Sequence, residues 1–293
     1  MIKRSIGDKI FDLINTLFML FMIVITIYPI IYVALASISD SNLLLAHSGL
    51  LYKPLGFNLD AYKEVFKNPM ILVGFENTLF YVFVGTAISM VITIMGAYAL
   101  SRKQLWIRKY INLLVVVTMF FSGGLIPMYL LVKNIGLYDS RWALILPTAI
   151  NTYNMIVMRT AFSGFPTSLE EAAKIDGAND FQILIRIVIP LTTATIAVIL
   201  LFYAVARWND WFQASIYLRT REKYPIQLYL REVLIYSSTD SMQQGAAAGQ
   251  DAYAIGESIK YSTVMVSTLP ILIVYPFLQK YFVKGVMVGA VKG

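Results

Sequence analysis

Charged side chains of both signs crowd into one stretch between apolar runs, residues 168–191, which reads SLEEAAKIDGANDFQILIRIVIPL. The chemistry open to them is ion pairing and the capping of helix ends, because the chain has no plausible set of nucleophile, base and acid. Ser168 followed three residues later by Glu171 has the pattern of a capping box, in which the hydroxyl accepts from a helix amide and the carboxylate reaches back. We therefore expect a short helix to start at Leu169.

Gly177 and the residues after it predict that this helix ends and that a second one follows. A glycine just past a helix supplies the left-handed backbone that turns the chain. Asn179 or Asp180 can then cap a second helix, which begins at Phe181 and runs into the next apolar span. The stretch is predicted to form a stiff elbow of two helices at a membrane face, residues 168–185.

A second group of polar side chains lies inside an apolar run, at about residues 142–161. Hydroxyls and amides stand near its middle, at Thr148, Asn151, Thr152, Tyr153 and Asn154. Amides at bilayer depth must find partners, so this face is expected to point into a helix bundle or a wet cavity. One interpretation is hydrogen bonding between helices. The other is a pathway for a neutral polyhydroxylated solute with apolar ring faces, with Asn151, Tyr153 and Asn154 as contacts.

The sequence Arg-Trp-Asn-Asp-Trp, residues 207–211, follows the next apolar run. Paired tryptophans at the end of a span are typical of an interfacial aromatic belt, and this is the interpretation we favour. The alternative is a platform on which a sugar stacks at the outer mouth of a pathway. In that case Trp208, Asn209 and Trp211 would be pathway residues.

Composition places the chain in a membrane. Of its 293 residues 58% are hydrophobic and 14% are charged, and the mean hydropathy is +0.67, which is too apolar for a soluble domain of this size. The absence of cysteine excludes disulfides and thiolate metal sites, and a single histidine, His47, cannot build a histidine-rich metal site. The net charge of +7 reflects basic residues at the ends of apolar spans.

Six apolar runs are long enough to cross a membrane as helices, which predicts an all-α polytopic protein. They lie at about residues 10–35, 78–100, 110–131, 142–161, 187–206 and 263–282, within one transmembrane domain, residues 1–293. The first run is longer than the apolar core of a signal peptide, and no convincing cleavage pattern follows it, so we interpret it as an uncleaved span. Ser122-Gly123-Gly124 and Pro127 interrupt the third run, where we expect a bent or broken helix.

Basic residues indicate the orientation of these spans. The short loop after the second span carries four of them, Arg102, Lys103, Arg108 and Lys109, and no acidic residue. The short loop on the opposite side has only Lys133 and Arg141. Because short loops rich in lysine and arginine stay in the cytoplasm, both termini and the elbow are predicted to be cytoplasmic.

The elbow also carries a family resemblance. Glu171-Ala172-Ala173, Gly177, Ile187 and Pro190 resemble the EAA loop, EAA-x3-G-x9-I-x-L-P, of permease subunits in ATP-driven ABC importers. Ile189 stands where leucine is usual, a swap that keeps volume and apolarity. The resemblance implies the type I ABC importer permease fold. It also implies that the elbow is the coupling helix that docks in a cleft on a cytoplasmic ATPase.

Further segments resemble the carbohydrate branch of that family, and within it the subunit type similar to the maltose permease G subunit. They are Asp176-Gly177-Ala178 and the ending Gly289-Ala290-Val291-Lys292-Gly293. The segments FSGGLIP, LYDSRWALILP, ESIKY and YPFLQKYFVKGVMVGAVKG resemble permeases for complex glycans such as pectin or alginate fragments. By this resemblance the residues that couple to the ATPase are Glu170, Glu171, Ala172, Ala173, Asp176, Gly177, Ala178 and, in the tail 283–293, Lys292 and Gly293.

The chain lacks the parts of an energy-converting enzyme. It has no G-x4-G-K-[ST] phosphate loop and no dinucleotide fingerprint, so it is expected to bind no cofactor itself and to depend on partner subunits for ATP and Mg²⁺. An ion-coupled secondary transporter or a channel is the alternative function. It is disfavoured because the spans carry almost no central ionisable residue and show no repeated halves. A membrane enzyme fits less well still.

The predicted function is therefore that of one permease subunit in a bacterial ABC importer for an oligosaccharide or polysaccharide fragment. The resemblance implies a second, related permease subunit, a pair of ATPases and an external solute-binding protein as partners. The protein is expected in the cell membrane as a multi-pass protein, with no role in nucleic-acid binding. The transported sugar would leave chemically unaltered.

Overall fold

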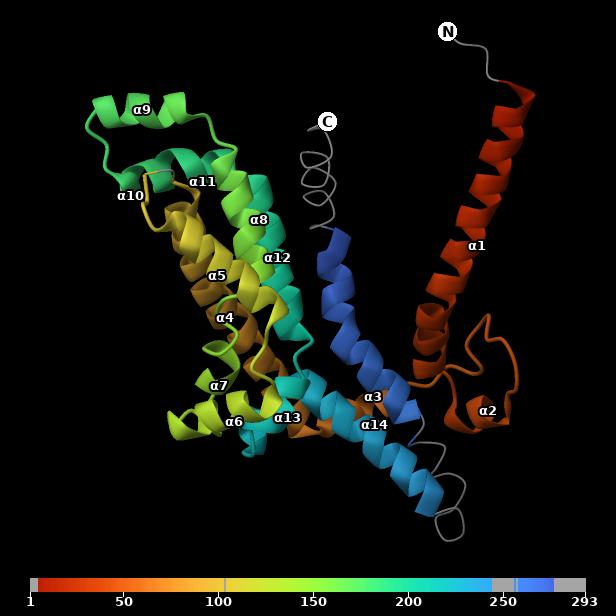
Figure 1. Ribbon diagram of the computed structural model, residues 1–293. Helices are drawn as coiled ribbons and strands as arrows, with labels where there is room; N and C mark the ends of the chain where they lie inside the picture. Colours follow the sequence, from red (N-terminus) through yellow and green to blue (C-terminus); the bar gives the residue numbers. More distant parts are fainter. Residues whose placement is uncertain (1–4, 103, 244–255, 257, 277–293) are drawn as a thin grey trace. The chain divides into compact units, whose positions relative to one another are not determined.

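The chain is built from helices, and a computed structural model describes residues 5–102, 104–243, 256 and 258–276 of it (Figure 1). Within these ranges there are no β-strands. The helices are α1 Ile6–Ser37, α2 Ser41–Ala46, α3 Asp60–Lys67, α4 Pro69–Ser101, α5 Arg108–Phe120, α6 Leu125–Asn134, α7 Trp142–Ile145, α8 Thr152–Ser163, α9 Thr167–Ile175, α10 Asp180–Ile183, the π-helix η1 Leu184–Val188, α11 Ile189–Leu191, α12 Thr193–Trp208, α13 Phe212–Tyr217, the 3₁₀-helix η2 Arg221–Lys223, α14 Ile226–Gln243 and a last helix, Ser258–Pro276.

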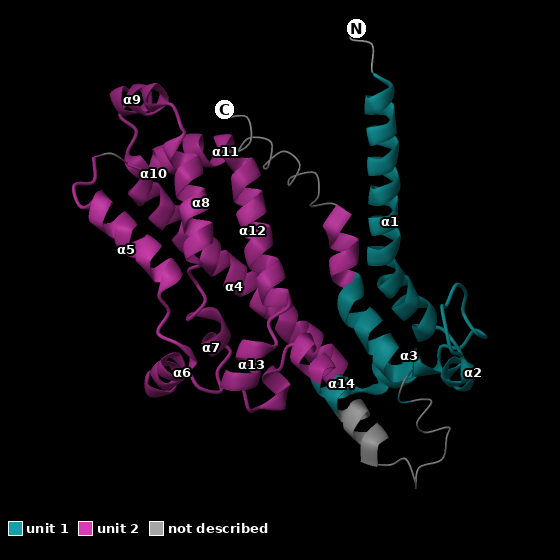
Figure 2. Cartoon of the chain, turned by 45° about the vertical axis from the view of Figure 1, so that its right-hand side comes forward, with its two compact units in different colours: residues 1–69, 232–269 teal, residues 70–231, 270–293 magenta. Residues whose placement is uncertain are grey.

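The chain divides into two compact units, residues 1–69 with 232–269 and residues 70–231 with 270–293 (Figure 2). In the first unit, α1 begins with a capping box. Ser5 Oγ accepts from the amide of Gly7 (3.3 Å), while the amide of Ser5 donates to Asp8 (2.9 Å). Apolar side chains along most of α1 are exposed, which suits a helix that faces lipid or another subunit.

Two apolar cores hold the second unit together, and α4 contributes to both. The first core joins α4 to α8, α9 and α12 through Met90, Tyr98, Met158, Phe162, Ala173, Ile199 and Tyr203. The second joins α4 to α6, α7, α13 and α14 through Tyr81, Val132, Leu144, Tyr217 and Leu228. Figure 1 shows the two sets of elements at opposite ends of the unit, with α9 to α11 at one end and α6, α7 and α13 at the other.

Three described helices are long and apolar enough to cross a membrane, namely α1, α4 and Ser258–Pro276. Two sharply bent pairs, α5 with α6 and Asp180–Leu191 with α12, would bring the number to five if each pair is one span. The long helices correspond to the first, second and sixth predicted spans, and the bent pairs correspond to the third and fifth. The part of the sixth span beyond residue 276, together with the predicted tail 283–293, lies outside the described residues.

The interruption predicted in the third span is confirmed. α5 ends at Phe120, α6 begins at Leu125, and the two helices are bent by 112°. Gly124 between them has φ of 85°, a backbone conformation that glycine adopts without steric cost. The helix is therefore broken here.

The fourth and fifth predicted spans differ from the helices that form. The fourth is split into α7 and α8. Pro147 lacks the amide donor that would continue the helix, and Asn151 then caps α8, its Oδ1 accepting from the amide of Asn154 (3.0 Å). The fifth is bent by 87° at Thr192, between α11 and α12. Pro190 lacks an amide donor just before the bend, and Thr192 Oγ1 donates to the carbonyl of Val188 (2.6 Å).

The predicted start of the elbow was wrong by two residues. α9 begins at Thr167, with Pro166 at the N-cap position and no capping bond from a side chain, so Ser168 and Glu171 do not form the expected capping box. Pro166 has extended backbone, φ −60° and ψ 122°, and proline favours a helix that begins directly after it. Ser168 therefore lies inside the first turn, where its hydroxyl cannot cap the helix.

Candidate functional site

The turn of the elbow has the geometry of a Schellman motif. Gly177 has φ of 82°, its amide donates to the carbonyl of Lys174 (3.0 Å), and the amide of Ala178 donates to the carbonyl of Ala173 (2.9 Å). These bonds satisfy carbonyls that the end of α9 would otherwise leave unpaired. The predicted end of the first elbow helix at Gly177 is confirmed.

Asn179 starts the second half of the elbow, as predicted. Its Oδ1 accepts from the amide of Gln182 (2.9 Å), and its own amide donates to Gln182 Oε1 (3.0 Å), which is a complete capping box. The helix begins at Asp180, one residue before the predicted position. The turn between the two helices of the elbow is therefore fixed by local hydrogen bonds.

Glu170 anchors α9 to the rest of its unit. Its carboxylate pairs with Arg102, which directly follows α4, and with Lys174 (3.3 Å). The guanidinium of Arg102 also lies over the ring of Tyr98, 4.5 Å from its centroid. Glu170 is only 7% exposed, and a buried charge is tolerated when it is paired in this way. The elbow is therefore tied to the end of α4 by an ion pair that water reaches poorly.

The opposite face of α9 is open. Glu171 and Ala172 are exposed, and Ile175, next to Asp176 at the end of the helix, is 86% exposed. Ala173 and Ala178 belong to the inner face, which packs on the core of the unit. Of the predicted coupling residues, Glu171, Ala172, Asp176 and Gly177 therefore lie on the surface of the elbow. Lys292 and Gly293 lie outside the described residues.

A cavity of about 560 Å³ opens between the start of α8 and the end of α12. Five of the six predicted pathway residues line it: Asn151, Tyr153, Asn154, Asn209 and Trp211. The sixth, Trp208, lies outside the lining; it is 8% exposed, and its ring stands 6.3 Å from that of Phe75. The hydroxyl of Tyr203 orders the wall, because it accepts from the amide of Asn151 (3.0 Å) and is bonded to Thr93 Oγ1 (2.8 Å).

Two charged residues in the cavity lining were not predicted. Arg207 and Asp210 belong to the Arg-Trp-Asn-Asp-Trp sequence, and their positions at the end of an apolar run gave no sign that they face inward. Burial raises the pKa of Asp210 to about 6, although the amide of Gln213 (3.1 Å) and the charge of Arg207 act in the opposite direction. The cavity therefore combines amides, hydroxyls and aromatic rings with one cationic and one acidic group.

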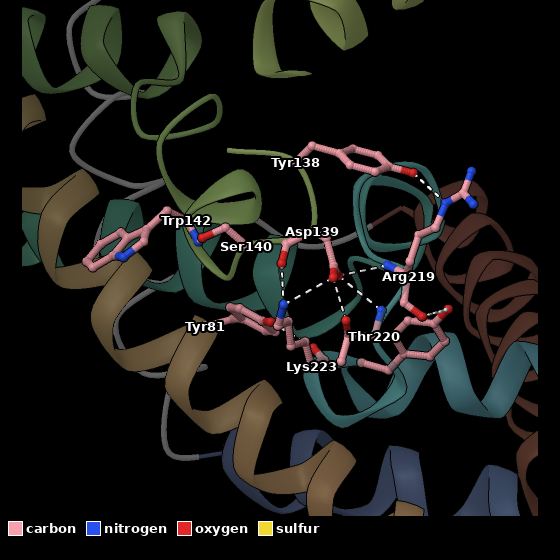
Figure 3. Close-up of polar contacts among 9 residues, drawn as sticks. Tyr81, Tyr138, Asp139, Ser140, Trp142, Arg219, Thr220 and Lys223 are labelled. Atoms are coloured by element: carbon pink, nitrogen blue, oxygen red, sulfur yellow. Dashed lines mark hydrogen bonds and ion pairs between the residues drawn. The ribbon is translucent and has the colours of Figure 1, made fainter. Parts of the chain in front are cut away.

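A third polar cluster lies at the end of the unit opposite the elbow and centres on Asp139 (Figure 3). Its carboxylate accepts from the amides of Arg219 and Thr220 (both 3.0 Å), from the hydroxyl of Thr220, and pairs with Lys223 (3.2 Å). Burial favours the neutral acid, but the bonds from Thr220, Arg219 and Lys223 outweigh it and hold the pKa of Asp139 well below its ordinary value.

This Asp139 cluster fastens the loop after α13 to α4. Tyr81 donates to the carbonyl of Lys223 (2.7 Å), and Asn77 donates to the carbonyl of Glu222 (2.7 Å). Arg141 in turn donates to Asn77 Oδ1 (2.8 Å). Sequence reasoning missed this cluster, because its members come from three separate segments. Among the described residues no group of three histidine, aspartate or glutamate side chains is placed to hold a metal ion.

Comparisons with known proteins agree on one family. No protein-family model matches the chain. The polygalacturonan/rhamnogalacturonan transport system permease protein YtcP of Bacillus subtilis is 43% identical over 289 residues, which are 98% of this chain and 99% of that protein. Protein LplC of Bacillus subtilis is 42% identical over 98% of this chain and 96% of its own length. The inner membrane ABC transporter permease protein YcjP of Escherichia coli is 29% identical over 92% and 93%.

A solved structure is similar over nearly the whole chain. It belongs to a bacterial ABC transporter involved in the import of the acidic polysaccharide alginate, with a TM-score of 0.88, 33% identity, and coverage of 96% of this chain and 100% of that one. This likeness confirms the predicted fold class, an all-α polytopic membrane protein with an ABC importer permease fold.

Proposed function

Because the chain belongs to the family of carbohydrate ABC importer permeases, we propose that it is the transmembrane subunit that couples ATP hydrolysis to oligosaccharide passage. ATP and Mg²⁺ are bound by partner ATPase subunits. A second, related permease subunit and an external solute-binding protein complete the transporter. Membership of this family argues against the alternative function, an ion-coupled carrier or a channel.

The coupling role is supported by a difference between the two faces of α9, one of which is buried and paired while the other is exposed. The inner face is held by the pair of Glu170 with Arg102, whereas Glu171 and Ile175 on the outer face are exposed. In the part of the chain that the structure describes, Glu171 takes part in no ion pair. An exposed apolar side chain beside an unpaired charge suits a surface that becomes buried in a partner.

Movement of the elbow would reach the pathway through rigid contacts. The guanidinium of Arg102 also donates to the carbonyl of Phe162 in α8 (3.4 Å), so the elbow is tied to the ends of both α4 and α8. The other end of α8 is capped by Asn151, which lines the cavity. When the ATPases close on ATP, the elbow moves with them, and α4 and α8 carry this displacement to the cavity.

The cavity supports an oligosaccharide as the solute. Its volume of about 560 Å³ falls in the range of ligand sites, and Asn151, Asn154 and Trp211 offer amides and a ring to a polyhydroxylated molecule. Permeases similar to this chain are named for polygalacturonan, rhamnogalacturonan and alginate. We therefore assign a polysaccharide fragment as the solute, and the bacterial cell membrane as the location, with both termini in the cytoplasm.

The coupling role is tested by reversing one charge. Glu171→Lys in the assembled transporter should reduce uptake at least tenfold, because the exposed carboxylate would face a basic group on the ATPase. Its amount in the membrane and its thermal unfolding midpoint should be unchanged, since Glu171 is bonded to no described part of the chain. Glu64→Lys, the same reversal on α3, is the control and should transport normally. Normal uptake by Glu171→Lys would contradict the coupling role.

A further inference from the structure

Arg207 is a buried cation whose bonding partners are all neutral. Its guanidinium donates to the carbonyl of Leu144 (3.1 Å), Thr148 Oγ1 (3.4 Å) and Ser89 Oγ (2.8 Å), and the side chain is 7% exposed. Its Nε has no bonding partner in the described structure. Among the described residues no carboxylate forms an ion pair with it. A buried charge without a directly bonded carboxylate normally costs stability, which makes this guanidinium a candidate binding group for a ligand in the cavity.

The backbone of α4 makes room for this guanidinium. A Cβ at Gly85 would lie 2.6 Å from the central carbon of the Arg207 guanidinium, closer than real side chains approach. Glycine therefore lets the cation lie flat against the helix, where Ser89 one turn further on fixes its plane. The planar group is held in one orientation before any ligand arrives, which reduces the entropy cost of binding.

The cavity next to Arg207 is suited to a sugar that carries a carboxylate. Thr148 and Arg207 share a wall with Asn151 and Asn154, and Trp211 supplies an aromatic ring. Leu144, Thr148 and Ser89 already occupy donors of Arg207, so a carboxylate would meet its positive charge and the donors that remain, in a charge-assisted bond stronger than one to a hydroxyl. Asp210, also in the lining, weakens the attraction because its charge acts on Arg207, although burial favours its neutral form.

Resting on the proposed function, we propose that Arg207 binds the carboxylate of a uronic acid residue, so that the cavity is a subsite for acidic oligosaccharides. The amides of Asn151 and Asn154 bind the hydroxyls of the same sugar, and Trp211 contacts the face of its ring. Asp210 keeps the affinity low enough for release, because its carboxylate repels the carboxylate of the sugar. The mid-span amides alone suggested a neutral polyhydroxylated solute, and Arg207, which the sequence did not place in the cavity, adds a group for a carboxylate.

The test compares two probes that differ in one charge per residue. The assembled transporter, without its binding protein, is placed in lipid nanodiscs, and calorimetry measures its affinity for a galacturonate trisaccharide and for the methyl ester of that trisaccharide. The acid should bind about tenfold more tightly than the ester, the effect expected of hydrogen bonds to a charged group. Arg207→Gln should abolish this preference, whereas Arg207→Lys, which lacks the planar fork, should retain part of it.

A second variant, Asp210→Asn, distinguishes the loss of a binding group from misfolding. Removing the competing charge should increase the affinity for the acid several-fold and leave that for the ester unchanged, a gain that misfolding cannot produce. Equal affinities for the two probes in the wild type, an Arg207→Gln variant that keeps the preference, or no binding of either probe would each overturn the subsite. None of these results affects the uptake defect of Glu171→Lys, which tests the permease role separately.

Discussion

Glu170 and Glu171 are neighbours with the same side chain, yet α9 turns them to different surroundings. Successive residues of a helix point about 100° apart, so one carboxylate reaches Arg102 and the other reaches solvent. Sequence alone assigned both to a contact with the ATPase. Only the position of Arg102 at the end of α4, far away in the sequence, reveals that Glu170 positions the elbow.

Arg207 and Asp210 show the same limit at the cavity. Amides in mid-span signal an inward face, because lipid offers them no partner. A charged residue at the end of a span gives no such signal, since it can equally well reach the membrane surface. Five of the predicted pathway residues line one cavity, whereas Arg207 and Asp210 beside them were not expected there. That these residues contact a solute stays a prediction.

Asp139 offers a prediction at the scale of one residue. Its φ of 54° is tolerated by asparagine, so Asp139→Asn removes the charge without new backbone strain. The variant should lower the free energy of unfolding by about 2 kcal/mol at pH 7, because the donors from Arg219, Thr220 and Lys223 lose an anionic acceptor. Denaturation of the purified permease, monitored by circular dichroism, measures this difference.

The pH dependence of that difference has a definite sign. The pKa of Asp139 is lower in the folded protein than in the unfolded one, so its contribution to stability is present above about pH 4 and is lost as the pH falls further. Asp60→Asn is the control, since that carboxylate is exposed and its pair with Lys63 (2.8 Å) lies at the surface. Equal effects of the two variants at pH 7 would contradict a special role of Asp139.

At the scale of helices, sequence predicts breaks well where glycine marks them and poorly elsewhere. Gly123-Gly124 correctly located the break between α5 and α6. The bends at Pro147 and Thr192 fall within apolar runs, and apolarity continues across a bend because the whole run stays in the same membrane or core. Hydropathy therefore reports where the chain is buried in an apolar medium, and only the backbone bonds determine where the helix turns.

The elbow depends on one backbone conformation at Gly177. Gly177→Ala should cost about 1 kcal/mol through its left-handed φ, whereas Gly177→Asn should cost less, because asparagine tolerates that region. A Cβ here meets no atom within 4 Å, so strain and not collision is the cause. The thermal unfolding midpoint and the ATP hydrolysed per sugar transported report the effect on fold and coupling.

Gly123→Ala serves as the matched control for this variant. Gly123 likewise has no atom within 4 Å of an added Cβ, and its φ lies outside the left-handed region. It should therefore change neither stability nor coupling. If Gly177→Ala proved as silent as Gly123→Ala, the turn would not require a glycine, and coupling would have to depend on the exposed side chains of α9 alone.

At the scale of the second unit, the two polar clusters outside the cavity have complementary tasks. The elbow and the Asp139 cluster lie at opposite ends (Figure 1), and α4 is bonded to both, through Arg102 directly after it and through Asn77 and Tyr81 near its start. In the proposed coupling, α4 would carry displacement between these two ends. The cavity lies along this connection, since Tyr203 in its lining is bonded to Thr93 of α4.

The orientation that we propose for the second unit is directly testable. The native chain contains no cysteine, so each introduced cysteine is its only thiol. Asn134→Cys at the end of α6 and Ala172→Cys on α9 both replace exposed residues, at opposite ends of the unit (Figure 1). A membrane-impermeant maleimide should label Asn134→Cys in intact cells, and Ala172→Cys only after the membrane is permeabilised, because lysine and arginine in the short loop near the elbow hold it in the cytoplasm.

Detergent-denatured samples of both variants provide the control, because each thiol must then react fully even where an ATPase covers α9 in the assembled transporter. Labelling of Ala172→Cys in intact cells would place the elbow outside. A cytoplasmic ATPase would then be unable to reach Glu171, and the proposed coupling would fail together with the orientation. Protection of Asn134→Cys in intact cells would instead place the end of α6 within the membrane or the cytoplasm, and the break at Gly124 would then turn the chain back to the side from which it entered.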